Sequence, residues 1–428
     1  MSILHELVKE IPLPQMAKVK QTFDDTEIED VTAVLVTEFE QKKIATTIKP
    51  GMSIAVAVGS RGLDRLVEMT KATIDFIKQH GGEPFIVPCM GSHGGATAEG
   101  QKAVLEHLGV KEEVVGAEIR SSMEVIKIDE LENGLPIYVD KLASEADGIV
   151  VINRVKPHTA FRGPFESGIM KMISIGLGKQ KGAEACHQLG FKHMAEHVPA
   201  MAKIIIDKMP ILFAVASVEN AYDRIKILEV LLPEDIEARE PTLQEISKAS
   251  LPKIFFEQID VLIIDEIGKN ISGDGMDPNV TGRYPTPYAY GGPDVSKMVV
   301  LDLTEETEGN ANGVGTADFT TQKLVDKMDR EATYANGLTS TVVGPTHIST
   351  AMPSDKTAIQ AAIKTCNILD FSKARVVRIK NTLEIGEIEV SINMKEDVET
   401  HQQLERITDW YNWNFDQDGN FMKETNDK

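Results

Sequence analysis

Short apolar runs alternate with longer amphipathic stretches along the chain. The first run, SIAVAVG at residues 53–59, precedes residues 63–79, in which apolar positions recur at helical spacing, and the next run is FIVPCM at residues 85–90. Further apolar runs of strand length are DGIVVIN at 147–153, ILFAVASV at 211–218 and VLIIDEIG at 261–268. Strands that alternate with helices predict an α/β fold with a mostly parallel sheet.

A helix is predicted after the second of these strands, because its sequence carries signals for both ends. Thr97 can cap the N-terminus, Glu99 lies in the first turn, and Gly109 follows the last turn. The turn that enters this helix is GSHGG, and six glycines fall between residues 81 and 100. This clustering of glycine is the first indication of a site.

The length of 428 residues predicts two domains, each large enough to bury a core. A charged, polar segment at residues 232–253 separates two predicted strands, and we place the boundary near residue 255. The prediction is therefore two α/β domains, over residues 1–255 and 256–428, with a cleft between them. Residues 268–294 form a long loop of the kind that is usually functional or mobile. The C-terminal tail, which holds both tryptophans, is expected to pack on the body.

Composition and charge exclude several classes of protein. The longest apolar stretches fall far short of the roughly 20 residues of a membrane span, and the N-terminus lacks the basic and apolar regions of a signal peptide, so we expect a cytoplasmic protein. A net charge of −21 would repel a nucleic-acid backbone. Three widely spaced cysteines, at 89, 186 and 366, make neither a disulfide framework nor a four-thiolate metal site. Any metal ligands must therefore be histidines and carboxylates.

Ligands of parallel α/β sheets bind at the carboxyl ends of the strands, where three turns stand out. They are GSRG at 59–62, GSHGG at 91–95 and KPH at 156–158. His93 and His158 are candidate general acids or bases, because imidazole titrates near neutral pH. The structural alternatives are that His93 only caps its turn and that His158 is an ordinary loop histidine.

Gly-rich turns before helices often hold anions on backbone N–H groups. The segment ISIGLGKQ at 173–180 nevertheless lacks the first glycine and the final Ser/Thr of a P-loop, and the GLG and GVG segments lack the third glycine of the dinucleotide motif. These departures argue against an ordinary ATPase or an NAD-dependent dehydrogenase.

Two further residues are candidate site residues because of the sequence around them. Lys171 lies in the apolar run SGIMKMISI, where a lysine tends to lose its proton and become nucleophilic, although a snorkelling lysine fits the same pattern. His187 is either a metal ligand or a partly exposed helical histidine. Residues 193–197 also read H-x-x-E-H, a pattern that can bind zinc on one helix face, which leaves a zinc-dependent hydrolase as an alternative.

Four segments taken in order, GSHGGAT, NRVKPHTAF, SGIMKM and GLGKQKGAEACH, resemble the nickel-dependent lactate racemase family, which uses a nickel-pincer nucleotide. The resemblance is best from about residue 53 to residue 210. It implies that Lys171 holds the cofactor covalently through a thioamide and that His187 ligates the nickel. It also implies that His93 and His158 are the acid/base pair that handles the hydroxyl proton of a 2-hydroxy acid, while hydride moves between C2 and the cofactor.

The resemblance extends to the remaining contacts and partners. The N-terminal domain would bind the cofactor, its phosphate being received by the Gly-rich turn, and the C-terminal domain would complete the substrate cleft. Where the family carries Tyr-Gln and a downstream Lys, this chain reads GKNISGDGM, which argues against lactate as the substrate. The implied partners are a small 2-hydroxy acid and cofactor-biosynthesis enzymes; a homodimer and a non-catalytic binding protein of the same fold both stay open. The residues implied are Ser92, Gly94 and Gly95 for the phosphate, Arg61 for the substrate carboxylate, and Lys269 or Asn270 for substrate contacts in the second domain.

Overall fold

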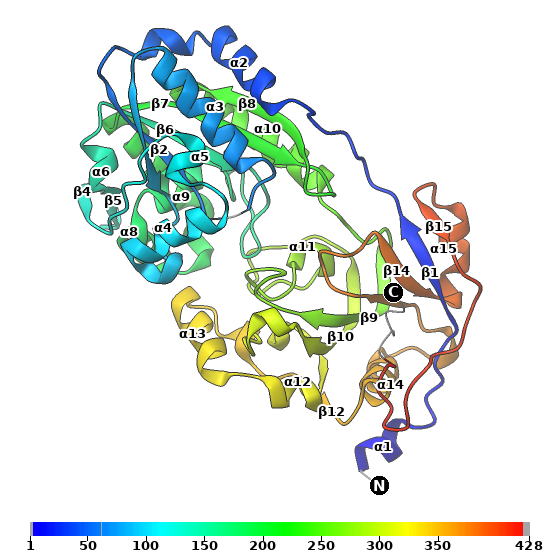
Figure 1. Ribbon diagram of the computed structural model, residues 1–428. Coiled ribbons are helices and arrows are strands. Elements are labelled where there is room, and N and C mark those ends of the chain that lie inside the picture. Colours follow the sequence, from blue (N-terminus) through cyan, green and yellow to red (C-terminus); the bar gives the residue numbers. More distant parts are fainter. Residues whose placement is uncertain (1–2, 61, 423–428) are drawn as a thin grey trace. The chain divides into compact units, whose positions relative to one another are not determined.

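The computed structural model describes residues 3–60 and 62–422, and Arg61 lies outside the described residues (Figure 1). The chain forms two compact units. Residues 24–251 make up one, called here the inserted unit, and residues 1–23 together with 252–428 make up the other, the terminal unit. Among the described residues, no helix is both long and apolar enough to cross a membrane.

The inserted unit is built on a five-stranded sheet of order β3-β2-β6-β7-β8. The first four strands are parallel and β8 is antiparallel to β7. Their central residues are buried on both faces, as expected for a parallel sheet covered by helices. The bounds are β2 Ser53–Val58, β3 Glu83–Pro88, β6 Gly148–Arg154, β7 Ile211–Glu219 and β8 Ile225–Leu231.

Helices cover this sheet, and α2 and α3 lie side by side against it (Figure 1). The rings of Phe39, Phe76 and Phe213 meet in the core on that side, with centroid separations of 4.3 and 5.5 Å. The bounds are α2 Val31–Gln41, α3 Leu66–Gln79, α4 Ala98–His107, α5 Glu112–Val115, α6 Lys141–Ser144, α7 Ile169–Lys171, α8 Lys179–His187, α9 Met194–Lys208 and α10 Pro233–Ser250, with a small hairpin of β4 Val125–Glu130 and β5 Pro136–Asp140.

Both predicted ends of α4 are confirmed. The Thr97 side chain accepts a hydrogen bond from the Gly100 N–H at 3.0 Å, and Gly109 follows the helix with a φ of +86°. The polar segment predicted to separate the domains is helix α10, and the division between the units falls just after it.

The terminal unit contains an eight-stranded sheet of order β12-β11-β10-β9-β13-β14-β1-β15. The strands from β12 to β13 are parallel, and β13, β14, β1 and β15 pair antiparallel. The fold class, α/β with mostly parallel sheets, is confirmed. The bounds are β1 Met16–Gln21, β9 Gln258–Ile267, β10 Asp294–Leu303, β11 Phe319–Thr321, β12 Thr350–Met352, β13 Val376–Ile379, β14 Glu387–Ser391 and β15 Leu404–Arg406.

The predicted domain of residues 1–255 needs a correction at its N-terminal end. Strand β1 lies between β14 and β15, beside the orange and red segments in Figure 1, so it belongs to the terminal unit. Met16 and Val19 are fully buried there. A local pattern could not reveal this, because the pairing partners of β1 lie at the opposite end of the chain.

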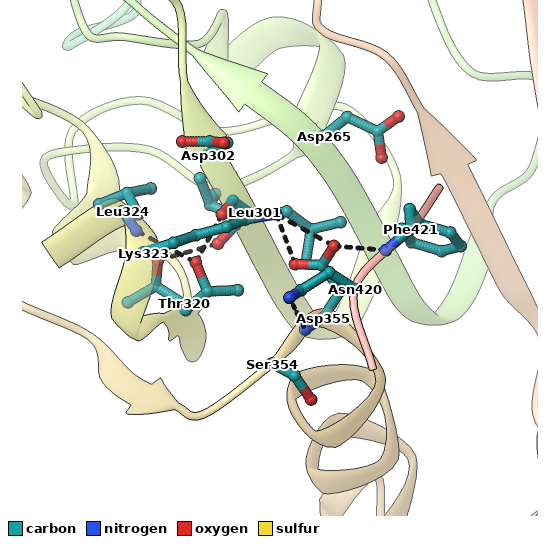
Figure 2. Close-up of polar contacts among 12 residues, drawn as sticks. Asp265, Leu301, Asp302, Thr320, Lys323, Leu324, Ser354, Asp355, Asn420 and Phe421 are labelled. Atoms are coloured by element: carbon teal, nitrogen blue, oxygen red, sulfur yellow. Dashed lines mark hydrogen bonds and ion pairs between the residues drawn. The ribbon is translucent and has the colours of Figure 1, made fainter. Parts of the chain in front are cut away.

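Helix α14 packs on one face of the terminal sheet, over a core that includes Val261, Val299 and Ile359. The tail covers the N-terminus of this helix: the Asp355 carboxylate pairs with Lys323 at 2.8 Å and accepts the Phe421 N–H at 2.9 Å (Figure 2). The tail therefore packs on the body as predicted, and Trp413 contacts the same core. The helices of this unit are α1 Ile3–Val8, α11 Pro278–Thr281, α12 Gln322–Lys327, α13 Arg330–Ser340, α14 Asp355–Thr365 and α15 Lys395–Thr400.

Candidate active site

The three turns singled out in the sequence all leave the carboxyl edge of the five-stranded sheet, after β2, β3 and β6. The Gly-rich turn after β3 folds back on the start of α4. A Cβ on Gly94 would lie 2.7 Å from the backbone N of Gln101, and Gly94 has a φ of +65°. Only glycine fits at this position, so the clustering of glycine reflects a tight turn that presents His93.

His93 is exposed, and its Nδ1 forms a hydrogen bond with the Ser60 hydroxyl from the turn after β2. The main chain of the His93 turn is held from below by Gln101, whose Nε2 donates to the carbonyl oxygens of Gly91 at 2.9 Å and His93 at 3.2 Å. Gln101 is fully buried. Neither partner of His93 was predicted, although Ser60 lies in a turn that the sequence had marked.

A buried ion pair lies beneath this turn. Lys179 and Asp140 are both fully buried, with Nζ and Oδ2 3.1 Å apart. Lys179 also donates to the carbonyl of Pro88 at the end of β3 and to Gln101 Oε1 at 3.1 Å. Burial raises the pKa of Asp140, and the Lys179 charge opposes that rise. The network thus joins the end of β3, the start of α4 and the start of α8 under the His93 turn.

The loop after β6 is held by Glu166, which is fully buried. Its carboxylate accepts the His158 N–H at 2.8 Å and the Arg162 guanidinium at 3.2 Å, and pairs with Lys248 at 3.0 Å. The His158 Nδ1 accepts the Ala160 N–H at 3.0 Å. Glu166 therefore fixes the main chain at His158, a role that the sequence did not suggest.

Lys171 ends α7 and is followed at once by a π-helical turn, Met172–Gly176. Such turns often occur at functional sites. The Lys171 Nζ donates a hydrogen bond to Ser167 Oγ at 3.5 Å. Glu240 of α10 is fully buried and accepts the Met170 N–H at 2.9 Å, so a carboxyl group caps the start of the helix that carries Lys171.

His187, at the end of α8, lies near His158 and Lys171. The ring centroid of Phe191 is 5.5 Å from that of His187 and 5.9 Å from that of His158. Burial, followed by the charges of Lys171 and His187, holds the pKa of His158 well below its usual value. Burial, and next the Lys171 charge, lowers the pKa of His187 to about 4. The structure therefore groups three of the four predicted residues, and burial lowers the pKa of both imidazoles.

The turn that carries His93 contacts the same group of elements. The Gly91 N–H donates to the Gly176 carbonyl at 3.4 Å, and a Cβ on Gly91 would lie 3.5 Å from the Cβ of Ala183 in α8. Ala183 lies one turn before His187 on that helix. The three turns, the π-helical turn and α8 thus form one edge of the inserted unit.

A comparison with protein families finds a match over part of the chain, with residues from both units. Residues 5–198 match the model of the lactate racemase N-terminal domain. The family is assigned over these residues alone. The resemblance seen in the four sequence segments is therefore confirmed.

The lactate racemase fold extends over most of the chain. The structure of the lactate racemase apoprotein from Thermoanaerobacterium thermosaccharolyticum matches with a TM-score of 0.53 and 12% identity, covering 86% of this chain and 99% of that one. A protein from Thermotoga maritima matches with a TM-score of 0.46 and 13% identity, covering 71% of this chain and 81% of that one. A comparison with curated proteins finds no significant match.

The H-x-x-E-H segment of this lactate racemase domain begins α9. The ring centroids of His193 and His197 are 5.6 Å apart, and His193 Nδ1 lies 3.6 Å from Glu196 Oε2. The His197 Nε2 is engaged by the Asn133 side-chain amide at 3.0 Å. Nowhere in residues 3–60 and 62–422 do three or more His, Cys, Asp or Glu side chains group so that they could hold a metal ion. The geometry thus adds no third ligand to the zinc pattern.

Lys269 lies in the terminal unit, after β9, and its side chain forms hydrogen bonds with other residues of that unit. Its Nζ donates to the Gly273 carbonyl at 2.6 Å and to Asn336 Oδ1 at 2.7 Å. Asn270 accepts the Thr304 hydroxyl at 2.7 Å. Both residues therefore shape the loop after β9, and a substrate contact by Lys269 stays a prediction.

Proposed function

We propose that the protein is a racemase or epimerase that inverts C2 of a 2-hydroxy acid, using a nickel-pincer nucleotide attached to Lys171. One observation carries the proposal: His158, Lys171 and His187 are grouped at the carboxyl edge of a sheet within a domain of the lactate racemase family. The family match supports racemase-type chemistry, and the nickel cofactor and the substrate are our proposal.

The donor set fits such a cofactor. His187 has a pKa of about 4, so at neutral pH its ring carries a lone pair that can ligate nickel. Lys171 would provide the amine for the covalent link. The turn of Ser92, Gly94 and Gly95 would provide backbone N–H groups for the phosphate. When bound, the nucleotide would supply hydride-transfer chemistry at C2 of the substrate.

The side chains of the inserted unit supply the proton chemistry in this proposal. His93 and His158 act on the hydroxyl group of the substrate; Ser60 holds the ring of His93, and Glu166 holds the main chain of His158. Phe161, 4.6 Å from the His158 ring, and Phe191 shield that imidazole from water. On sequence grounds we assign the substrate carboxylate to Arg61, assisted by Lys269 of the terminal unit.

The covalent link gives the first test. After co-expression with enzymes that make the cofactor, intact-mass analysis should show an adduct on the wild-type protein that is lost in Lys171→Ala and kept in Lys181→Ala. Lys181 is the matched control because it is exposed and lies ten residues further along the chain, on α8. An unmodified Lys171 together with absence of bound nickel would disprove the proposal.

The second test identifies the substrate and uses protein that carries the cofactor. Each member of a panel of 2-hydroxy acids, from short to polyhydroxylated, is incubated as one enantiomer, and its configuration at C2 is followed by chiral chromatography. We expect inversion of at least one acid other than lactate. Loaded protein that inverts none of them would instead support a non-catalytic binding protein of the same fold.

A further inference from the structure

The two histidines assigned to proton chemistry differ in the partner of Nδ1. At His158 the partner is a backbone N–H, that of Ala160, at 3.0 Å. A backbone N–H can only donate, so the His158 Nδ1 must carry a lone pair. The ring is therefore the neutral tautomer whose proton is on Nε2, an assignment that rests on the hydrogen-bond partner.

The surroundings of His158 keep the ring in this arrangement. Its N–H donates to Glu166 at 2.8 Å, and its carbonyl accepts a hydrogen bond from Arg162 at 2.6 Å. The loop is closed at its base by a bridge between Lys156 and Ser167. Since the main chain on either side of the ring is fixed, the Ala160 N–H stays opposite Nδ1.

At His93 the partner of Nδ1 is the Ser60 hydroxyl, which can donate or accept. When Ser60 accepts, Nδ1 carries the proton and Nε2 carries a lone pair that can take a proton from the substrate. His93 can thus present a basic Nε2, and neutral His158 cannot.

We propose that His93 is the base for both enantiomers and that His158 acts as a hydrogen-bond donor through Nε2–H. This inference rests on the proposed function. The O–H bond of the substrate breaks toward Nε2 of His93, which becomes an imidazolium, and the same proton returns to the oxygen at the end of turnover. His158 keeps its proton throughout and stabilises the negative charge that develops on that oxygen.

The tautomer can be measured on the protein as expressed, without cofactor or substrate. With ¹⁵N-labelled histidine, two-dimensional ¹⁵N–¹H spectra distinguish a protonated from an unprotonated ring nitrogen, and the His158 signals are those lost in His158→Gln. At neutral pH we expect an unprotonated Nδ1 and a protonated Nε2. A proton on Nδ1 overturns the inference, whatever the enzyme catalyses.

Kinetics of the loaded enzyme test the roles. Glutamine carries an N–H near the position of the imidazole Nε2 but cannot act as a base, so His158→Gln should keep kcat/KM within about tenfold of wild type in both directions. His158→Ala removes the donor and should lose roughly 100-fold or more. His93→Gln removes the base and should lose about 100- to 10,000-fold in both directions.

The possible failures are distinguishable. If His158→Gln binds cofactor yet is as inactive as His158→Ala, His158 is a base and the inference is overturned. A variant that fails to fold or load is recognised by its circular dichroism and intact mass, and the tautomer measurement then decides. If the loaded wild-type enzyme inverts no acid, the proposed function fails together with the assigned roles, even where the expected tautomer is observed.

Discussion

The structural role of single residues in this protein depends on partners that are distant in the sequence. Lys179 lies in a segment that departs from the P-loop pattern, and nothing in the segment indicates that the side chain is fully buried against Asp140. A buried lysine requires a carboxylate and further hydrogen-bond acceptors, which here come from three other elements, β5, β3 and α4. The pair therefore acts as a structural support for the turn that presents His93.

Removing one partner of the Lys179–Asp140 pair should destabilise the folded protein. Lys179→Met would leave Asp140 buried and unpaired, which we expect to lower the free energy of unfolding by about 3–5 kcal/mol. The exposed neighbour Lys181 provides the control, since Lys181→Met should change it by no more than about 0.5 kcal/mol. Urea unfolding of the three proteins measures both changes, and equal effects of the two substitutions would contradict a supporting role for Lys179.

At the scale of elements, apolar periodicity predicted the strands and helices well, but not the irregular segment that carries Lys171. The π-helical turn after Lys171 packs tightly: a Cβ on Gly176 would lie 2.7 Å from Cys89 Sγ and 2.8 Å from Met172 Sδ. The run SGIMKMISI is apolar apart from Lys171 and two serines, so its pattern cannot distinguish a π-helical from an α-helical hydrogen-bond register. The turn packs against α8, α9, β5 and β6, contacts that the local pattern does not contain.

Glu240, which caps this segment, should make stability depend on pH. Burial raises the pKa of Glu240 from 4.5 to about 8, so the folded state holds a proton that the unfolded state has released between these values. This contribution to stability is full below pH 4.5 and is lost as the pH rises toward 8, by up to about 1.4 kcal/mol per unit. Glu240→Gln keeps the oxygen that accepts the Met170 N–H and removes the titrating group.

Urea midpoints of wild type and Glu240→Gln should therefore diverge from pH 5 to pH 8, with the variant relatively more stable at the higher pH. The exposed Glu234 on the same helix supplies the comparison, because Glu234→Gln should follow the pH dependence of the wild type. A constant difference between wild type and Glu240→Gln over this range would show that Glu240 is ionised in the folded protein.

At the scale of the whole molecule, one compact unit is inserted into the other. The chain leaves the terminal unit after Phe23 and returns near Phe255, and the two rings stack with centroids 5.3 Å apart. Gln21 also donates to the Lys253 carbonyl at 3.2 Å. The two crossing points are therefore adjacent on the terminal unit, so a short linker can replace the inserted unit.

Fragments test this organisation. Residues 24–251 alone should unfold cooperatively, because they contain the whole five-stranded sheet. Residues 252–428 alone should not, since they lack β1, which separates β14 from β15. Joining residues 1–23 to residues 252–428 through a Gly/Ser linker should restore cooperative thermal unfolding by circular dichroism. A stable fold of residues 252–428 on their own would contradict the role assigned to β1.

The sequence by itself determined the α/β class, the main strands and helices and the family, because these depend on local periodicity and on short ordered motifs around His93, His158, Lys171 and His187. Only the tertiary structure decided which unit holds β1, which buried groups support each turn, and which backbone group faces Nδ1 of His158. Those properties depend on contacts between distant segments: the strand pairs of β1, the Lys179–Asp140 pair, and a loop folded so that the Ala160 N–H meets a histidine ring.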